Sequence, residues 1–130
     1  MSYYFNTTLP TSFDDAVART VLALKAEGFG IISEIDVQRT LREKIGAAFR
    51  KYKILGACNP KLAHEALQLE DKIGTMLPCN VVVQELEDGT VEVAAIDPVA
   101  SMQAVDNPRL KDAAAEVAQS LKRAIGSMGG

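Results

Sequence analysis

The stretch from Asn80 to Ile96 restricts the fold more than any other part of the chain. Two runs rich in valine and alanine flank Asp88-Gly89, a dipeptide that is preferred in two-residue hairpin turns. A tight turn of this kind joins antiparallel neighbours. The chain is therefore expected to build an antiparallel sheet around this pair of strands.

The predicted two-residue turn also fixes the register of the hairpin. It places Glu85 opposite Glu92 near the turn, a like-charge pair that costs up to about 1 kcal/mol unless a cation intervenes. At the far end it makes one face apolar, formed by Val81, Val83, Ala94 and Ile96. Helices cover only one face of such a sheet, so this second apolar patch needs another cover. We therefore expect a homodimer, in which an equivalent chain covers the patch.

Three earlier runs have the β-branched and aromatic composition of strands, at residues 3–8, 29–35 and 52–58. In the second run, alternation predicts one strand face made of Phe29, Ile31, Ser33 and Ile35. Together with the hairpin, these runs predict a sheet of about five strands.

Helical periodicity separates the strands. Ser12, Asp36 and Asn59 are good N-cap residues, and apolar residues recur three or four positions apart after each of them. After the hairpin we expect a short helical piece at 99–105 and then a long helix with an apolar stripe from Leu110 to Ile125. These elements predict an α+β fold, a two-layer sandwich whose largely antiparallel sheet has helices on one face, the first and last helices above all.

The chain has 130 residues, of which 48% are hydrophobic, so it can bury one substantial core. We expect a single domain over residues 1–126 and a flexible tail at 127–130. Only 5% of the residues are aromatic and none is tryptophan, so the core is expected to be aliphatic.

Charge and hydropathy argue against several kinds of partner. The 14 basic and 17 acidic residues give a net charge of −3 without a prominent basic run, which disfavours nucleic-acid binding. No stretch has the length of a membrane span or the pattern of a secretory leader, so we expect a cytoplasmic protein without a membrane partner. In that compartment the two cysteines are expected to be free thiols.

The candidate site lies in residues 52–83, which contain both cysteines and the only histidine. Cys58 directly precedes the N-cap of a predicted helix, whose free N–H groups and dipole can stabilise a thiolate. It could equally be a small buried residue of the third strand. His64, in the second turn of that helix, could act as its base or could simply be a surface residue. Gly56 leaves space beside Cys58, for a ligand or for a bulge or close backbone approach.

Three kinds of function fit these residues. The first is a ligand-binding or interaction domain whose site is formed by Tyr52, Gly56, Cys58, Asn59, Cys79 and Asn80. The second is a thiol-dependent redox or sulfur-handling enzyme that uses Cys58 with His64 or Cys79. The third is a metal-binding protein that uses Cys58, His64 and Cys79. We rank them in this order and therefore expect no cofactor and no metal.

The middle of the chain also resembles a bacterial and archaeal family, the domain of unknown function 302. The resemblance rests on short segments spread over about half the chain: residues 44–46, 52–60, 73–74, 77–83 and 97–98. It implies a two-layer α+β domain, similar to the TATA-binding-protein-like superfold, that tends to form dimers. It implies no reaction, and the fold likeness to a DNA-binding protein is a weak argument for this acidic chain.

Overall fold

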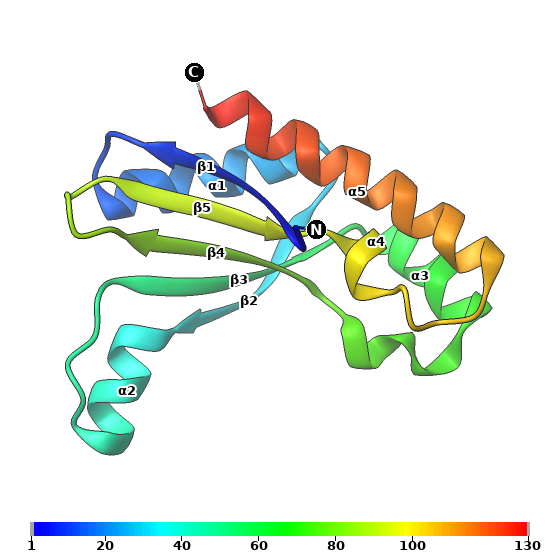
Figure 1. The fold of residues 1–130 in the computed structure, drawn as a ribbon, viewed down its shortest axis with the longest axis horizontal. Helices are drawn as coiled ribbons and strands as arrows, with labels where there is room; N and C mark the ends of the chain where they lie inside the picture. Colours follow the sequence, from blue (N-terminus) through cyan, green and yellow to red (C-terminus); the bar gives the residue numbers. More distant parts are fainter. Residues whose placement is uncertain (1, 130) are drawn as a thin grey trace.

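Five antiparallel strands form one sheet in the order β1-β5-β4-β3-β2, in a computed structural model that describes residues 2–129 (Figure 1). The strands are β1 (Tyr4–Leu9), β2 (Gly30–Asp36), β3 (Tyr52–Cys58), β4 (Cys79–Glu85) and β5 (Val91–Ile96). β1, the first strand in the chain, pairs with β5, the last one, and forms one edge of the sheet. The predicted α+β class and antiparallel sheet are confirmed.

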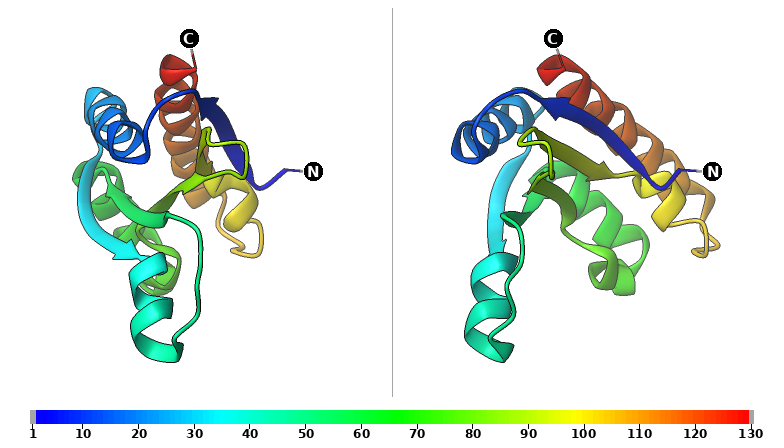
Figure 2. Two further views of the ribbon diagram at one scale, coloured as in Figure 1. Left: turned by 90° about the vertical axis from the view of Figure 1, so that its left-hand side faces the viewer. Right: turned by 60° about the vertical axis from the view of Figure 1, so that its left-hand side comes forward.

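Helices cover one face of the sheet, as predicted. They are α1 (Phe13–Ala26), α2 (Val37–Ile45), α3 (Pro60–Leu69), α4 (Pro98–Ser101) and α5 (Pro108–Met128), together with the 3-10 helix η1 (Asp71–Met76). α1 and α5 pack side by side over the strands, and α3 and α4 contact α5 (Figure 1). α2 instead projects away from the rest of the molecule (Figure 2).

The core is aliphatic and lies between the sheet and the pair α1 and α5. Its centre is built from completely buried side chains that alternate along the strands and recur along the helices: Leu24, Leu55, Val81, Val83, Val91, Val93 and Leu121. Burial of a residue of this type stabilises the folded state by about 1.5–3 kcal/mol relative to exposure. The alternating apolar residues of β4 and β5 and the apolar stripe of α5 therefore pack in the same core.

The hairpin between β4 and β5 has a different turn from the one predicted. Leu86 and Thr90 pair through a Leu86 N–H bond to the Thr90 carbonyl at 2.8 Å, which leaves a three-residue loop. Gly89 has a φ of +87°, and the Asp88 carboxylate accepts from both the N–H and the hydroxyl of Thr90. A three-residue loop with a left-handed glycine at its end is the next most common hairpin connection. The expected two-residue turn is therefore wrong.

The longer loop shifts the register by one residue and changes both faces. Glu92 lies opposite Gln84 rather than Glu85, and its carboxylate accepts bonds from Gln84 Nε2 at 2.8 Å and Asn6 Nδ2 at 2.9 Å. The expected like-charge pair does not form. The predicted apolar patch also divides, because Val81 and Val83 are buried beneath the helices. Ala94 and Ile96 lie on the opposite face with Val82, and no helix within residues 2–129 covers that open face.

β2 contains a bulge that also breaks the predicted alternation. Ile31 pairs with Ala57 and Ser33 pairs with Gly56, so Ile32 is an extra residue between them. A Cβ on Gly56 would lie only 2.1 Å from Ser33 Oγ and 2.7 Å from Pro78 Cγ. The glycine therefore permits a close approach of neighbouring segments, and it is not open space for a ligand.

The last helix is longer than predicted. α5 continues through Met128, which packs partly buried against the main core, so residues 127 and 128 belong to the helix rather than to the expected tail. Gly130 lies outside the described residues. Within residues 2–129, no helix combines the length and the apolar character that crossing a membrane requires.

Candidate functional site: an apolar pocket between two hydrophobic clusters

The buried apolar residues form two clusters with a space between them. The main cluster lies under α1 and α5, and a smaller one joins α3, η1, α4 and the first half of α5 through Ala66, Ile73, Met102, Leu110 and Ala114. A pocket of about 280 Å³ lies where the clusters face each other, and residues of both line it. The pocket is therefore a gap in packing between two parts of one apolar interior.

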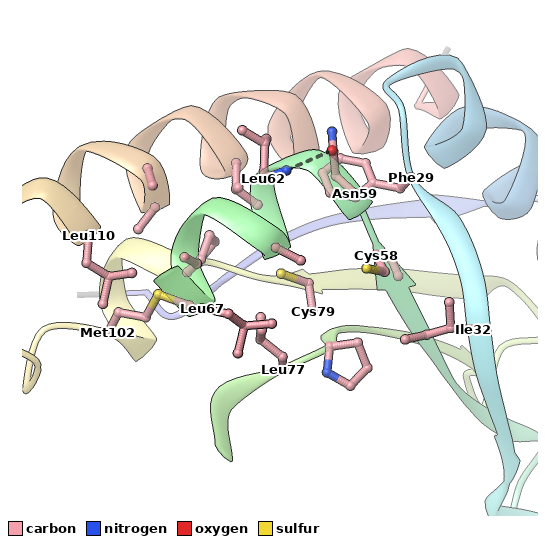
Figure 3. A pocket seen from close by; sticks show the side chains of 18 residues that line it. Phe29, Ile32, Cys58, Asn59, Leu62, Leu67, Leu77, Cys79, Met102 and Leu110 are labelled. Atoms are coloured by element: carbon pink, nitrogen blue, oxygen red, sulfur yellow. Dashed lines mark hydrogen bonds between the residues drawn. The ribbon is translucent and has the colours of Figure 1, made fainter. Parts of the chain in front are cut away.

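The sheet side of the domain and three helices form the wall of this pocket (Figure 3). The sheet side contributes Phe29, Ile32, Ala57, Cys58, Asn59, Leu77, Pro78 and Cys79. The helices contribute Leu62, Ala63, Ala66 and Leu67 from α3, Pro98 from α4 with Met102 directly after it, and Leu110, Ala113, Ala114 and Val117 from α5. Fifteen of these 18 side chains are hydrocarbon or thioether, and none is charged.

The start of α3 is fixed by its cap. The Asn59 side chain accepts a hydrogen bond from the Leu62 N–H at 3.2 Å, and Pro60 occupies the first turn, where its missing N–H has no consequence. This cap sets the direction in which α3 leaves β3. The apolar side of α3, with Leu62 and Ala66 buried, then faces α5 across the pocket.

Both thiols line the pocket, but their environments differ. Cys58 is half-buried, whereas Cys79 is 7% exposed, and both are free. Burial raises the pKa of the Cys79 thiol to about 11, with a smaller contribution from the nearby Cys58. At neutral pH Cys79 is therefore a protonated, unreactive part of the wall, and Cys58 is the more accessible thiol.

His64 does not join the cysteines. It is exposed on the outer side of α3, where its Nε2 lies 3.2 Å from Gln68 Nε2, within hydrogen-bond distance. It lines a separate surface hollow together with Arg109 and Asp112. The hypothesised Cys58–His64 pair is therefore not assembled in this structure. Across residues 2–129, no group of three histidine, cysteine or acidic side chains is placed to hold a metal ion.

The predicted ligand-binding residues divide between two sites. Cys58, Asn59 and Cys79 line the apolar pocket, whereas Tyr52 and Asn80 line a hollow of about 350 Å³ on the open face of the sheet. For Cys79 and Asn80 the division follows from β4, since neighbouring residues along a strand point to opposite faces. Tyr52 and Cys58 are separated because they lie at opposite ends of β3.

Sequence reasoning missed the far wall of the pocket. Met102 and Leu110 are almost completely buried there, and Ala113 and Ala114 leave the space open. Their apolar spacing in the sequence indicated a buried helix face. It contained no information that this face would turn toward α3 as well as toward the sheet.

Comparisons with known proteins give the family. The family model "Domain of unknown function DUF302" matches residues 5–128. The chain belongs to the DUF302 family. Its fold is similar to the crystal structure of an uncharacterized conserved DUF302 protein from Bacillus stearothermophilus, with a TM-score of 0.91 and 28% sequence identity over 98% of this chain and 99% of that one. No match was found among curated proteins.

Proposed function

We propose that this DUF302 domain binds a small apolar molecule in the pocket between α3, α5 and the sheet. The observation that carries the proposal is the composition of the wall, in which the only polar side chains are the two thiols and the Asn59 amide. Ligand pockets are typically apolar cavities with a few polar groups that orient the ligand. Here Cys58 and Asn59 are those groups.

The volume of the pocket limits the ligand. A space of about 280 Å³ corresponds to roughly ten non-hydrogen atoms if each takes up about 30 Å³, the share of one water molecule in the liquid. An uncharged alkyl or acyl chain of eight to ten carbons is the simplest ligand of this size. A chain that keeps such a gap gains stability when a ligand fills it.

The assembly proposed for this domain is a homodimer through the open face of the sheet. Its support is a hollow lined by Tyr4, Tyr52, Val82, Ala94 and Ile96, which no helix of the described chain covers. Light scattering tests the proposal, because a mass near 14.0 kDa at micromolar concentration contradicts it. The two free thiols further support a reducing compartment such as the cytoplasm.

A thiol-dependent function is the second candidate. It is favoured by one observation, the position of the half-buried Cys58 on the wall of a pocket that is large enough for a substrate. An apolar electrophile bound there would lie beside this thiol. Cys79 is a poor nucleophile at neutral pH because its pKa is about 11.

Calorimetric titration with octanol and decanol tests ligand binding directly. We expect saturable binding at one site per chain, and Ala113→Leu, which fills the pocket, should weaken it at least tenfold. Ala115→Leu is the matched control, because Ala115 lies on the exposed side of the same helix and does not line the pocket. Equal binding by the two variants, or no binding by the native chain, would contradict the proposal.

Labelling with N-ethylmaleimide near neutral pH separates the two candidate functions. If the domain only binds ligands, decanol should protect Cys58 from labelling, and the protein should show no thiol-dependent turnover. Since His64 faces another hollow, His64→Ala should leave the labelling rate unchanged. Slower labelling in His64→Ala would restore the thiol–imidazole hypothesis.

A further inference from the structure

The charges of the chain are divided unequally between one protruding segment and the remainder. We call residues 37–51, which comprise α2 and the loop after it, the α2 arm. The arm has one acidic residue, Glu43, and five basic ones, Arg39, Arg42, Lys44, Arg50 and Lys51. Its net charge is +4 in a chain of net charge −3, so the rest of the chain has a charge of −7. The basic arm of one molecule is therefore attracted to the acidic remainder of a second molecule.

The arm also has an apolar side that the described residues cover only in part. Val37, Leu41 and Ile45 recur every fourth residue along α2, but the helix contains no buried residue, and Ile45 is 74% exposed. A helix of nine residues is too short to be stable without packing on another surface. Figure 2 shows α2 projecting away from the sheet and the other helices.

The base of the arm is connected to the open face of the sheet. Arg50 stacks over the Phe49 ring at 4.3 Å and lies 5.5 Å from the centre of the Tyr52 ring. Its Nε donates to Gln84 Oε1 at 2.8 Å, and Gln84 in turn donates to Glu92. The arm and the open face are therefore one continuous surface.

The accessible surface of the chain is larger than a compact monomer requires. It measures 7660 Å², whereas a folded monomer of 14.0 kDa exposes about 6,700 Å². The excess of about 1,000 Å² is close to the roughly 800 Å² that each partner buries in a standard interface. One dimer contact that includes the open face and the arm would remove it.

We propose that the α2 arm clasps a second copy of this chain. In this arrangement Ile45 packs against the partner, and Arg39, Arg42 and Lys44 lie against its acidic body. The proposal rests on the homodimer proposed above and adds the element that holds the two chains together. Because part of the attraction is electrostatic, the dimer should weaken as salt concentration rises.

Sedimentation equilibrium of the full chain at 50 and 500 mM NaCl tests the clasp. The arm variant is Arg39→Gln/Arg42→Gln/Lys44→Gln, and the control is Lys25→Gln/Lys61→Gln/Lys122→Gln, which removes the same charge from exposed positions on α1, α3 and α5. We expect the arm variant to raise the dimer dissociation constant at least tenfold and to lose most of the salt dependence. The control should change the constant less than threefold.

Ile45→Gln provides a second test, because it removes the apolar side chain and leaves the charge of the arm unchanged. The exposed position makes a folding defect in the monomer unexpected, and circular dichroism checks this. It should also raise the dissociation constant at least tenfold.

The outcomes separate the clasp from the dimer itself. A native chain that dimerises with the same affinity as both arm variants overturns the clasp and leaves the dimer standing. A native chain that is monomeric at every concentration overturns both. If that monomer instead co-sediments with vesicles of three parts phosphatidylcholine and one part phosphatidylglycerol, and the arm variant does not, the arm binds an anionic lipid surface and the clasp is wrong.

Discussion

Two excursions from the sheet, one before β3 and one after it, have similar sequence patterns but differ in how much they bury. The α2 arm enters β3 and the segment at 59–78 leaves it, and each contains a helix with a polar N-cap and apolar residues at helical spacing. The second segment buries Leu62, Ala66 and Ile73 and forms a wall of the pocket. The arm buries nothing.

The difference comes from a distant part of the chain. α3 is covered by α5, which begins about forty residues later, whereas the main contacts of α2 are with β2 and β3, the strands that flank it in the chain. Local sequence therefore determines that each segment is a helix. Tertiary packing determines which one becomes part of the core. The proposed partner of α2 is the cover that the chain itself lacks.

Truncation of one leucine in the α2 arm and of one in the cluster that supports α3 should give the largest contrast. Leu110→Ala removes a 1%-exposed side chain from the cluster that supports α3, and it should lower the free energy of unfolding by about 2–5 kcal/mol. Leu41→Ala, on the half-exposed side of α2, should lower it by less than about 1 kcal/mol. Urea denaturation of dilute protein, where the chains are dissociated, measures both. Similar losses would mean that α2 packs in the monomer after all.

The sequence predicted elements much better than it predicted relations between them. The periods of the strands and helices and the caps at Ser12, Asp36 and Asn59 were sufficient for the fold class, and the side chains of all three accept the expected cap bonds. The register of the hairpin was wrong because Asp88-Gly89 suits both a two-residue and a three-residue loop. Both loops place glycine at a positive φ.

The site was predictable only in part for the same reason. Cys58, Asn59 and Cys79 share one pocket because Ala57 pairs with Cys79 across β3 and β4, a register that one chain alone does not reveal. Position within a helix could not decide whether His64 turned toward Cys58 or toward solvent. The bulge at Ile32 has Gly30 on its own strand and Gly56 opposite it on β3, but neither glycine specifies where the extra residue falls. The bulge reverses the faces of the residues that follow it.

Alkaline pH should separate the two regions as well. The pKa of Cys79 is about 11 in the folded chain and about 9 in a model thiol, so the folded state retains a proton that the unfolded state loses between these values. Stability is therefore fully present below pH 9 and falls by up to about 3 kcal/mol as pH rises toward 11.

Chemical denaturation from pH 7 to 11 measures this effect. Cys79→Ala is the control. Because the substitution also changes packing, the comparison uses only how steeply the free energy of unfolding falls with pH in each protein. Equal slopes would show that Cys79 ionises as freely in the folded chain as in the unfolded one. The α2 arm contains no cysteine, so it has no corresponding contribution.

A substitution at the end of α2 should act on the arm alone. Gly46 ends the helix with a φ of +65°, so Gly46→Ala places a side chain in the left-handed region at a cost of about 1 kcal/mol. Because no residue of α2 is buried and its main contacts are with the flanking strands β2 and β3, the cost should appear as local opening. Hydrogen exchange of the α2 amides should be about fivefold faster, while the rest of the protein is unchanged.

Gly126→Ala is the matched control for that experiment. Gly126 lies within α5 at a helical position with open space around it, so alanine should stabilise the protein by about 0.5–1 kcal/mol. Slower exchange throughout α5, with no change in α2, would show that the two helices open independently. A global loss of stability in Gly46→Ala would contradict the local character of the arm.

The smallest predicted effect has opposite signs in the monomer and in the dimer. Arg39 Nε and Glu43 Oε1 form an exposed ion pair 3.0 Å apart on α2, in the less favourable order with the basic residue first. Glu43→Gln should therefore lower the helicity of the arm only slightly. The same change raises the charge of the arm from +4 to +5, which should tighten the proposed dimer about twofold at low salt and leave it unchanged at high salt. Circular dichroism and sedimentation on one preparation measure both effects, and a weaker dimer would mean that Glu43 itself contacts the partner.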